Sequence, residues 1–453
     1  MPVRIGVDNR RAAGVLGVIA LIGAMQMAAA PEAAAQERRE SPPLQEPTGA
    51  ITLRDAVTLA LMHNPGLAAY AWETRAREAR AVQAGTRPNP TLSVLAEDLG
   101  ATAGSSSATG QLIQPQTTIQ LAQLIELGGK RAARRELAER DRDLAAWDYE
   151  AARIDVITEV SRAFTDVLVA QETIALTEQT TRTVEDVHQS VGARVVAGVV
   201  SPIEETRATV ALALVRVEAA RARRTLDASR ARLAALWGSS TASFTSATGD
   251  LRADLPPLPL LRAIEAEVDR NPAVARWAAE MAARDASLAV ERSKRVLDVS
   301  IAAGYRRFTD IGGNALLIGA SVPLPLFDRN RGAIEEARSR VAQGYEQQRA
   351  ARARITAGLT DAYAALGSAH DEVTALADAV LPGSQQTFDA VSEGYRLGRF
   401  GYLDVLDAQR TLISAGSQYL RALSDYHKAI ANVERLIGTP LAGLTDPPTT
   451  PRE

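Results

Sequence analysis

Two carboxylates stand at a spacing that brings them together on a helix. Asp404 and Asp407 lie in the segment 402–408, which reads YLDVLDA. Residues three apart on a helix share a face, so the pair would form one acidic spot, and acidic spots attract cations. A plainer interpretation is that Asp404 caps the start of its helix, which is worth about 0.5–2 kcal/mol. The residue types alone leave both interpretations open.

Other reactive groups are scattered or missing. The histidines at positions 63, 188, 370 and 427 include no pair at metal-ligand spacing, which argues against a metal site. The segment 128–130, GGK, lacks the spaced glycine and the following Ser or Thr of a phosphate loop. The absence of cysteine excludes disulfides and thiolate chemistry. Without a triad, metal cluster or nucleophile elbow, the sequence predicts a protein that is not an enzyme and has no cofactor.

The composition favours long helices over a large globular core. Of the 453 residues, 46% are hydrophobic but only 4% are aromatic. Alanine and arginine are abundant, as in helices that pack closely through small residues. The net charge of −3 argues against nucleic acid as a partner.

The two ends of the chain are predicted to lie outside the fold. Three arginines precede an apolar stretch, and Ala33-Ala34-Ala35 offers a cleavage site, so residues 1–35 are predicted to be a signal peptide, with a short membrane anchor as the alternative. We expect a flexible leader over 36–49 and a flexible, proline-bearing tail over 439–453. No other window is apolar enough for a transmembrane helix, so any membrane entry must use β-strands.

The rest of the chain repeats itself at an offset of about 200 residues. The repeated pairs, in order, are Asn64-Pro65 and Asn271-Pro272, Leu127–Arg131 and Phe327–Arg331, Ala197-Gly198 and Leu397-Gly398, Ala208 and Ala408, and Leu236–Gly238 and Leu436–Gly438. The order indicates two copies of one unit, 50–238 and 260–438, with a linker at 239–259 that would form an equatorial belt. The sequence thus predicts a mainly α protein with a small β part and two internal repeats.

Each unit contains two predicted strands, at about 91–99 and 117–127 in the first and 297–308 and 315–324 in the second. Val299, Ile301, Ala303 and Tyr305 alternate with smaller or polar residues. Strands of about ten residues with one apolar face fit an outer-membrane barrel, but a sheet on an ordinary core has the same period.

Very long helices favour an elongated architecture. Residues 129–196 contain no proline and would span roughly 100 Å as a helix. The second unit has a matching helix over 331–396, interrupted near Leu381-Pro382, where proline should kink or break it. From the lengths we expect two return paths beside them, 202–237 continued by 272–294 and 402–437 continued by 65–87. Such helices need partner helices along their whole length, as in an antiparallel coiled coil.

These features together resemble the TolC-like outer-membrane factors over about residues 50–440. Within that family, the segment 125–131, IELGGKR, is similar to the heavy-metal branch, the CzcC-type subunits. The resemblance implies a homotrimer in which four strands per chain complete a 12-stranded barrel, continued by a long helical duct across the periplasm. It implies a location in the outer membrane lipid of a Gram-negative bacterium. It also implies two partners, a periplasmic adaptor (membrane fusion protein) and an inner-membrane pump of the resistance-nodulation-division (RND) class.

The resemblance also assigns roles near the two tight turns. Asp404 and Asp407, joined by Glu204 of the first repeat, would form the pore constriction, which favours cations. Tyr395 would help to lock the gate. The basic lock residue of the drug-efflux members falls at Phe400, so Arg399 becomes the second candidate. The tips that would contact the adaptor are Gly198, Val199, Val200, Ser201, Gly398, Arg399, Phe400 and Gly401.

The substrate is not fixed by these residues. The branch implies efflux of divalent heavy-metal cations, whereas other members of the family serve drug or multidrug efflux or type I secretion. A different class of protein, a soluble periplasmic coiled-coil scaffold, would explain the long coiled-coil helices but not the paired strands placed identically in both repeats.

Overall fold

A computed structural model describes residues 46–98, 115–252, 255–308 and 312–444. The predicted signal peptide, most of the leader and the last nine residues of the tail lie outside the described residues. Among those that are described, no helix is both long and apolar enough to cross a membrane. All the elements discussed below belong to one structural unit, Pro47–Glu453.

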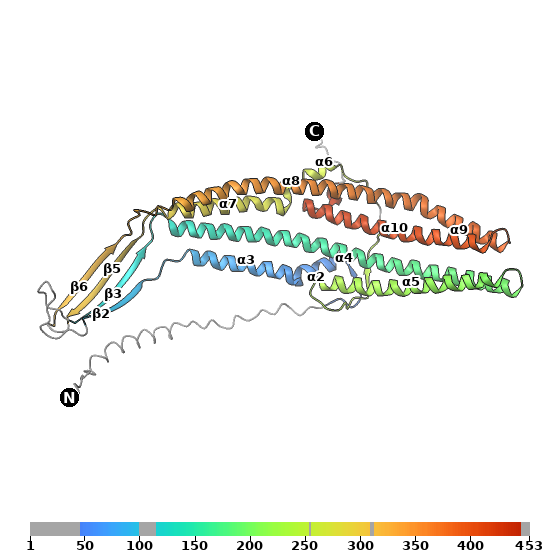
Figure 1. Cartoon of the computed structure of the whole chain (residues 1–453), viewed down its shortest axis with the longest axis horizontal. Coiled ribbons are helices and arrows are strands. Elements are labelled where there is room, and N and C mark those ends of the chain that lie inside the picture. Colours follow the sequence, from blue (N-terminus) through green and yellow to red (C-terminus); the bar gives the residue numbers. More distant parts are fainter. Residues whose placement is uncertain (1–45, 99–114, 253–254, 309–311, 445–453) are drawn as a thin grey trace, which may run out of the picture. The chain divides into compact units, whose positions relative to one another are not determined.

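The two repeats have the same order of elements (Figure 1). The first repeat consists of α2 Leu53–His63, α3 Pro65–Ala84, β2 Thr91–Glu97, β3 Gln116–Ile125, α4 Lys130–Val196 and α5 Pro202–Ala235. The second consists of the 3₁₀ turn η1 Val268–Arg270, α7 Pro272–Ser293, β5 Val299–Phe308, β6 Asn314–Ser321, α8 Arg331–Ala375, the π-helical turn η2 Leu376–Val380, α9 Leu381–Arg396 and α10 Tyr402–Ile437. Short elements complete the chain: β1 Ala50–Thr52, β4 Ser246–Thr248, α6 Leu261–Glu265 and η3 Leu441–Leu444.

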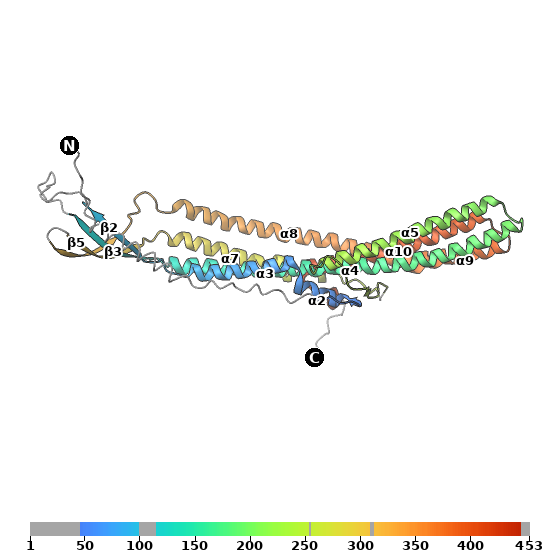
Figure 2. The same ribbon diagram turned by 90° about the horizontal axis from the view of Figure 1, so that it is seen from below.

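The 67-residue helix α4 is the central element, and α3, α5, α7 and α10 all pack against it (Figures 1 and 2). It begins after Gly129, whose φ of 73° lies in the left-handed region that glycine tolerates best. The predicted start and end of this helix are therefore confirmed.

The long helix of the second repeat is interrupted, as predicted, around Pro382. The break is a π-helical turn, η2, between α8 and α9. Proline has no N–H and its ring clashes with the carbonyl four residues earlier, and one wider turn removes that clash without ending the helix.

The repeated Asn-Pro pairs join the return helices end to end. The side chain of Asn64 accepts a hydrogen bond from Leu67 N at 2.8 Å and donates to Leu236 O, at the end of α5, at 2.7 Å. Asn271 does the same between Ala273 N and Leu436 O, at the end of α10. Hence α5 is continued by α3, and α10 by α7. The predicted pairing of these segments was wrong. It continued 202–237 with 272–294 and 402–437 with 65–87, whereas each helix is continued by a helix of its own repeat.

The four predicted strands form one antiparallel sheet in the order β2-β3-β5-β6. Cross-strand partners place Val94, Ile119, Tyr305 and Leu316 in one row, and Leu92, Leu121, Ala303 and Ile318 in the next. The large side chains in both rows are exposed. The sheet therefore has an uncovered apolar face, as the alternation predicted, and this observation disfavours a sheet that covers an ordinary core.

A small parallel pair, β1 with β4, lies beside α4 near its middle. The Gln171 amide of α4 pairs with both backbone groups of Ala247, with Ala247 N donating to Oε1 at 2.7 Å and Nε2 donating to the carbonyl at 2.9 Å. The Gln171 side chain thus pairs with the backbone of β4 as a neighbouring strand would, and it holds the segment that follows α5 against α4.

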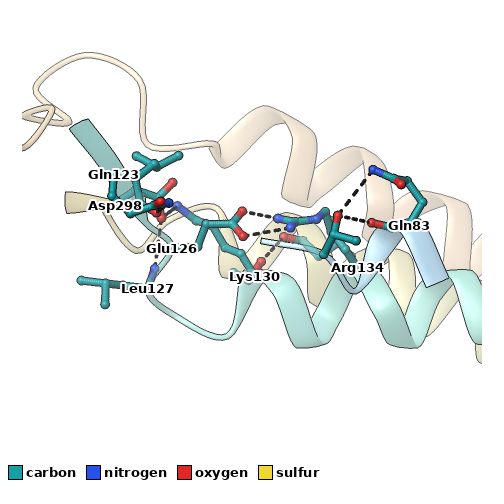
Figure 3. A network of polar contacts seen from close by, with 11 residues as sticks. Gln83, Gln123, Glu126, Leu127, Lys130, Arg134 and Asp298 are labelled. Carbon is teal, nitrogen blue, oxygen red and sulfur yellow. Dashed lines mark hydrogen bonds and ion pairs between the residues drawn. The ribbon is translucent and has the colours of Figure 1, made fainter. Parts of the chain in front are cut away.

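The junction between strand β3 and helix α4 is held by charged groups (Figure 3). Glu126 pairs with Arg134, and Lys130 pairs with Asp298 of the other repeat at 2.7 Å. Asp298 also accepts a hydrogen bond from Leu127 N at 3.1 Å. The IELGGKR segment therefore connects the sheet to the helices and joins the two repeats.

Candidate functional site

The two tight turns, between α4 and α5 and between α9 and α10, share one backbone geometry. Gly198 and Gly398 have φ angles of 71° and 74°. The residue after each glycine donates its N–H five positions back, Val199 to Arg194 O at 2.9 Å and Arg399 to Gly394 O at 2.7 Å. This bond and the left-handed glycine define the same helix-ending motif in both repeats.

The helices that leave the turns begin differently. Ser201 caps α5 by accepting a hydrogen bond from Ile203 N at 3.4 Å, and Pro202 follows at the first helical position. At the start of α10, the Asp404 carboxylate instead accepts the N–H of Gly401 at 2.8 Å. The capping interpretation of Asp404 is therefore correct, and it leaves the side chain exposed.

Apolar side chains are exposed at both tips. Val199 is 62% exposed and Phe400 is 48% exposed, while Val200 is half-buried. Phe400 covers Gly394, where an added Cβ would lie 2.2 Å from the phenyl Cδ2. The glycine thus permits the ring to lie flat against α9.

Asp404 and Asp407 lie together on one side of a groove of about 660 Å³ between α5 and α10. Arg207 and Arg410 line the same groove, with apolar side chains such as Leu214. No ion pair joins either aspartate to an arginine within the part of the chain that the structure describes. Both carboxylates therefore remain available to cations from solvent.

Tyr395 connects the two helical hairpins at the tips. Its hydroxyl donates to Glu204 Oε2 of α5 at 3.5 Å, and its carbonyl accepts from Arg194 Nη1 of α4 at 2.7 Å. The Arg194 guanidinium also stands 4.3 Å from the centre of the Tyr395 ring, in cation–π geometry. Burial raises the pKa of Tyr395, so at neutral pH its hydroxyl keeps the proton that it donates.

Tyr402 packs against Tyr395 with the two ring planes tilted by 54° and the ring centres 6.1 Å apart. Both rings belong to an apolar cluster that also contains Val191, Phe388 and Val405. Burial raises the pKa of Tyr402 to about 12. This cluster lies just inside the turns and holds α4, α5, α9 and α10 together.

The sequence profile of the outer membrane efflux protein family matches residues 56–239 and 263–439, which is most of both repeats. The chain belongs to this family. It is an outer-membrane efflux channel with a helical periplasmic extension, and not an enzyme, as the resemblance implied.

Two relatives and one solved structure agree with this assignment. The cobalt-zinc-cadmium resistance protein CzcC of Cupriavidus metallidurans is 36% identical over 87% of this chain and 91% of its own. The nickel-cobalt-cadmium resistance protein NccC of Alcaligenes xylosoxydans xylosoxydans is 30% identical over 73% of this chain and 71% of its own. The outer membrane protein VceC of Vibrio cholerae has the same fold, with a TM-score of 0.72, 18% identity, and coverage of 86% of this chain and 96% of its own.

The structure of this efflux protein brings together only some of the predicted site residues. Asp404 and Asp407 share a groove, but Glu204 faces Tyr395. Arg399 is exposed, and its guanidinium makes no hydrogen bond or ion pair with any residue that the structure describes. The described residues contain no group of three or more His, Cys, Asp or Glu side chains that could hold a metal ion.

Two contributors to the site escaped the sequence analysis. Arg194, which touches both the ring and the carbonyl of Tyr395, had no motif around it. Its position in the last turn of α4 was the only available signal, because cations are favoured there. Gly394 could have been noticed as a glycine inside a helix, which usually marks a close contact.

Proposed function

We propose that three copies of this efflux protein form one exit duct for divalent heavy-metal cations. The observation that carries the proposal is the exposed pair Asp404 and Asp407, one helical turn apart beside the turn at the end of the hairpin. Repeated three times around an axis, the pair would supply six carboxylates at the entrance. For these to attract cations, they must stand nearer the axis than Arg207 and Arg410, which line the same groove. The names of the two relatives, which refer to cobalt, zinc, cadmium and nickel resistance, support cations as the cargo.

The open edges of the sheet support the trimer. Within the described residues, β2 and β6 each pair on one side only. In lipid, such edges would leave N–H and C=O groups without partners, each at a cost of several kcal/mol or more. Pairing β6 of one copy with β2 of the next satisfies these groups, and three copies would close a sheet of twelve strands.

A duct of this kind provides a path and not energy. We propose that transport is driven by an inner-membrane pump of the RND class and that a periplasmic adaptor joins the pump to the tips. The exposed Val199 and Phe400 are the apolar contacts that an adaptor would cover. The cations must also leave, so the aspartates should attract them without closing a coordination shell.

We place the closing contacts of the gate around Tyr395. Its bonds to Glu204 and Arg194 hold the α9–α10 hairpin against the α4–α5 hairpin, and the free guanidinium of Arg399 is available to a neighbouring copy. Tyr395→Phe should raise the open probability of the channel, because it removes a long hydrogen bond to a carboxylate, worth about 0.5–1.5 kcal/mol. Tyr345→Phe, an exposed tyrosine of α8, is the matched control. Equal open probability in the two variants would remove Tyr395 from the gate.

The cargo is tested in a strain that lacks this gene. We expect the strain to become sensitive to cobalt, zinc and cadmium and to recover with the intact gene. Loss of drug resistance with unchanged metal tolerance would instead support a drug-efflux channel and overturn the choice of cargo.

The constriction is tested in single-channel recordings. Replacing Asp404 and Asp407 by alanine should weaken blockade by a trivalent cation by at least tenfold, because two charges per copy disappear. Asp425→Ala, an exposed aspartate of the same helix α10, should leave blockade unchanged. Blockade that survives the double substitution would place the constriction elsewhere.

A further inference from the structure

An open cleft lies where the second half of the sheet meets the helices. It measures about 710 Å³ and is lined by the segment between α7 and β5 and by the segment between β6 and α8. Its lining combines the cations Lys294, Arg295 and Arg329 with the apolar residues Leu297, Leu324 and Phe327. Ligand pockets in proteins are typically about 300–1,000 Å³, so the cleft can hold a small molecule or a headgroup.

The apolar side of the cleft continues the uncovered face of the sheet. In β5 this face carries Ile301 and Tyr305, and two-residue alternation extends it back to Leu297. In β6 it carries Leu316 and Ile318, and the same alternation extends it to Leu324 beyond the strand. Leu324 is 73% exposed and Phe327 is 99% exposed. An acyl chain lying against the sheet could therefore reach the cleft without leaving apolar surface.

The polar side of the cleft carries excess positive charge. Lys294 pairs with Glu291 at 2.6 Å, and Asp328 also lines the cleft. Arg295 and Arg329 form no ion pair with the described residues, and Arg329 only donates to Pro325 O at 3.4 Å. Guanidinium groups bind phosphate oxygens well because their N–H groups match the spacing of two oxygens.

The first repeat provides an internal comparison. At the equivalent junction, Glu126 neutralises Arg134 (Figure 3). Gln123 donates to Pro88 O at 3.0 Å. The offset of 200 residues places Leu326 and Ile334 where the first repeat has Glu126 and Arg134. The second junction has thus lost the carboxylate at this position. Among the described residues, Arg295 and Arg329 form no ion pair there, although Asp328 also lines the cleft.

We propose that this cleft binds the phosphate headgroup of an anionic phospholipid from the periplasmic leaflet of the outer membrane. The inference rests on the proposed placement of the apolar sheet face in lipid. Because the helices extend into the periplasm, the ends of α7 and β6 lie at the periplasmic side of that membrane. The phosphate contacts Arg295 and Arg329, and the acyl chains follow Leu297, Leu324 and Phe327 toward the sheet.

The proposal is tested by counting bound lipid on the full chain in detergent by native mass spectrometry. The probes are phosphatidylglycerol, phosphatidylcholine and inorganic phosphate. We expect phosphatidylglycerol to bind at least tenfold more tightly than phosphatidylcholine. Arg295→Gln/Arg329→Gln should weaken that binding by about 30-fold, the effect of two cations near an anionic surface. The charge-preserving pair Arg295→Lys/Arg329→Lys should retain most of it.

The matched control is Arg349→Gln/Arg354→Gln, two exposed arginines on α8. An equal loss in this control, or equal binding of the two lipids, would overturn the proposal. Displacement of the lipid by millimolar inorganic phosphate would identify a free-anion site and would also overturn it. The same spectra report the number of chains per particle, so a failure of the trimer is distinguished from a failure of the lipid site.

Discussion

Gly394→Ala isolates one contact at the tip. The new Cβ would lie 2.2 Å from Phe400 Cδ2 and 2.6 Å from Cε2, closer than non-bonded carbon atoms can approach. The ring must therefore leave its place against α9. Overpacking of this kind costs about 1–3 kcal/mol, and replacing a helical glycine by alanine returns about 1 kcal/mol. The net effect is a loss of about 1 kcal/mol, which corresponds to a roughly fivefold increase in local opening.

Local opening is measured by trypsin cleavage after Arg396, the last residue of α9, and after Arg399 in the turn. When opening and closing are fast relative to cleavage, the cleavage rate follows the population of the open tip. We expect a fivefold faster cleavage in Gly394→Ala than in the parent protein. Gly367→Ala in α8, where nothing lies within 4 Å of the added Cβ, should leave the tip unchanged.

A double-mutant cycle with Phe400→Ala decides the cause. If the clash with the ring is responsible, Gly394→Ala should not increase cleavage once the ring has been removed. Faster cleavage in both backgrounds would refute the reasoning and would point to the helix itself.

Three further predictions concern stability. Gly128→Ala should destabilise the protein by about 2–4 kcal/mol in thermal unfolding, because the position has positive φ and the new Cβ would lie 2.5 Å from the Cβ of Val296. The control is Gly129→Ala, which is also at positive φ but has free space around the added Cβ. It should cost only about 1–2 kcal/mol. Gln171→Leu should cost about 1–3 kcal/mol by leaving both backbone groups of Ala247 without that partner, and unchanged stability would exclude the role. Burial raises the pKa of Glu434, so the protonated side chain contributes to folding stability below about pH 4, and this contribution is lost as pH rises through the raised pKa. Glu434→Gln should therefore be more stable than the parent protein at about pH 7 and should lose that advantage at about pH 4. Paired melting curves at the two pH values measure the difference.

Helix boundaries could be predicted because glycine and proline mark them. Helix α4 begins directly after Gly129, α5 and α7 begin at Pro202 and Pro272, and each observed bound lies within a few residues of the predicted one. Strand faces could be predicted for a similar reason, since two-residue alternation is a local property of the sequence.

The order of the return helices could not be predicted from length. Both possible pairings balance the long helices, so rise per residue does not choose between them. The choice is made by Asn64 and Asn271, whose side chains each bond to a helix start and to a helix end. Their recurrence was visible in the sequence, but the carbonyls that they reach lie more than 160 residues away.

The site was predicted where the residues are neighbours in sequence and missed where they are not. Asp404 and Asp407 are three residues apart, so helical geometry alone places them together. Tyr395 meets Arg194 and Glu204 across 201 and 191 residues, and only the packing of two hairpins brings them into contact.

Duplication offers a physical criterion for locating function in this chain. Where both repeats share a backbone, the fold places the same demand on each, so a difference in side chains needs another cause. The turns satisfy this condition, since Gly198 and Gly398 have nearly the same φ, yet one turn continues with valines and the other with Arg399 and Phe400. The junctions satisfy it as well, since the first is closed by Glu126 and Arg134 while the second leaves a cleft beside Leu326. These differences lie at the tips and at the boundary between the sheet and the helices. We propose that the duct meets the adaptor at the first place and the membrane surface at the second.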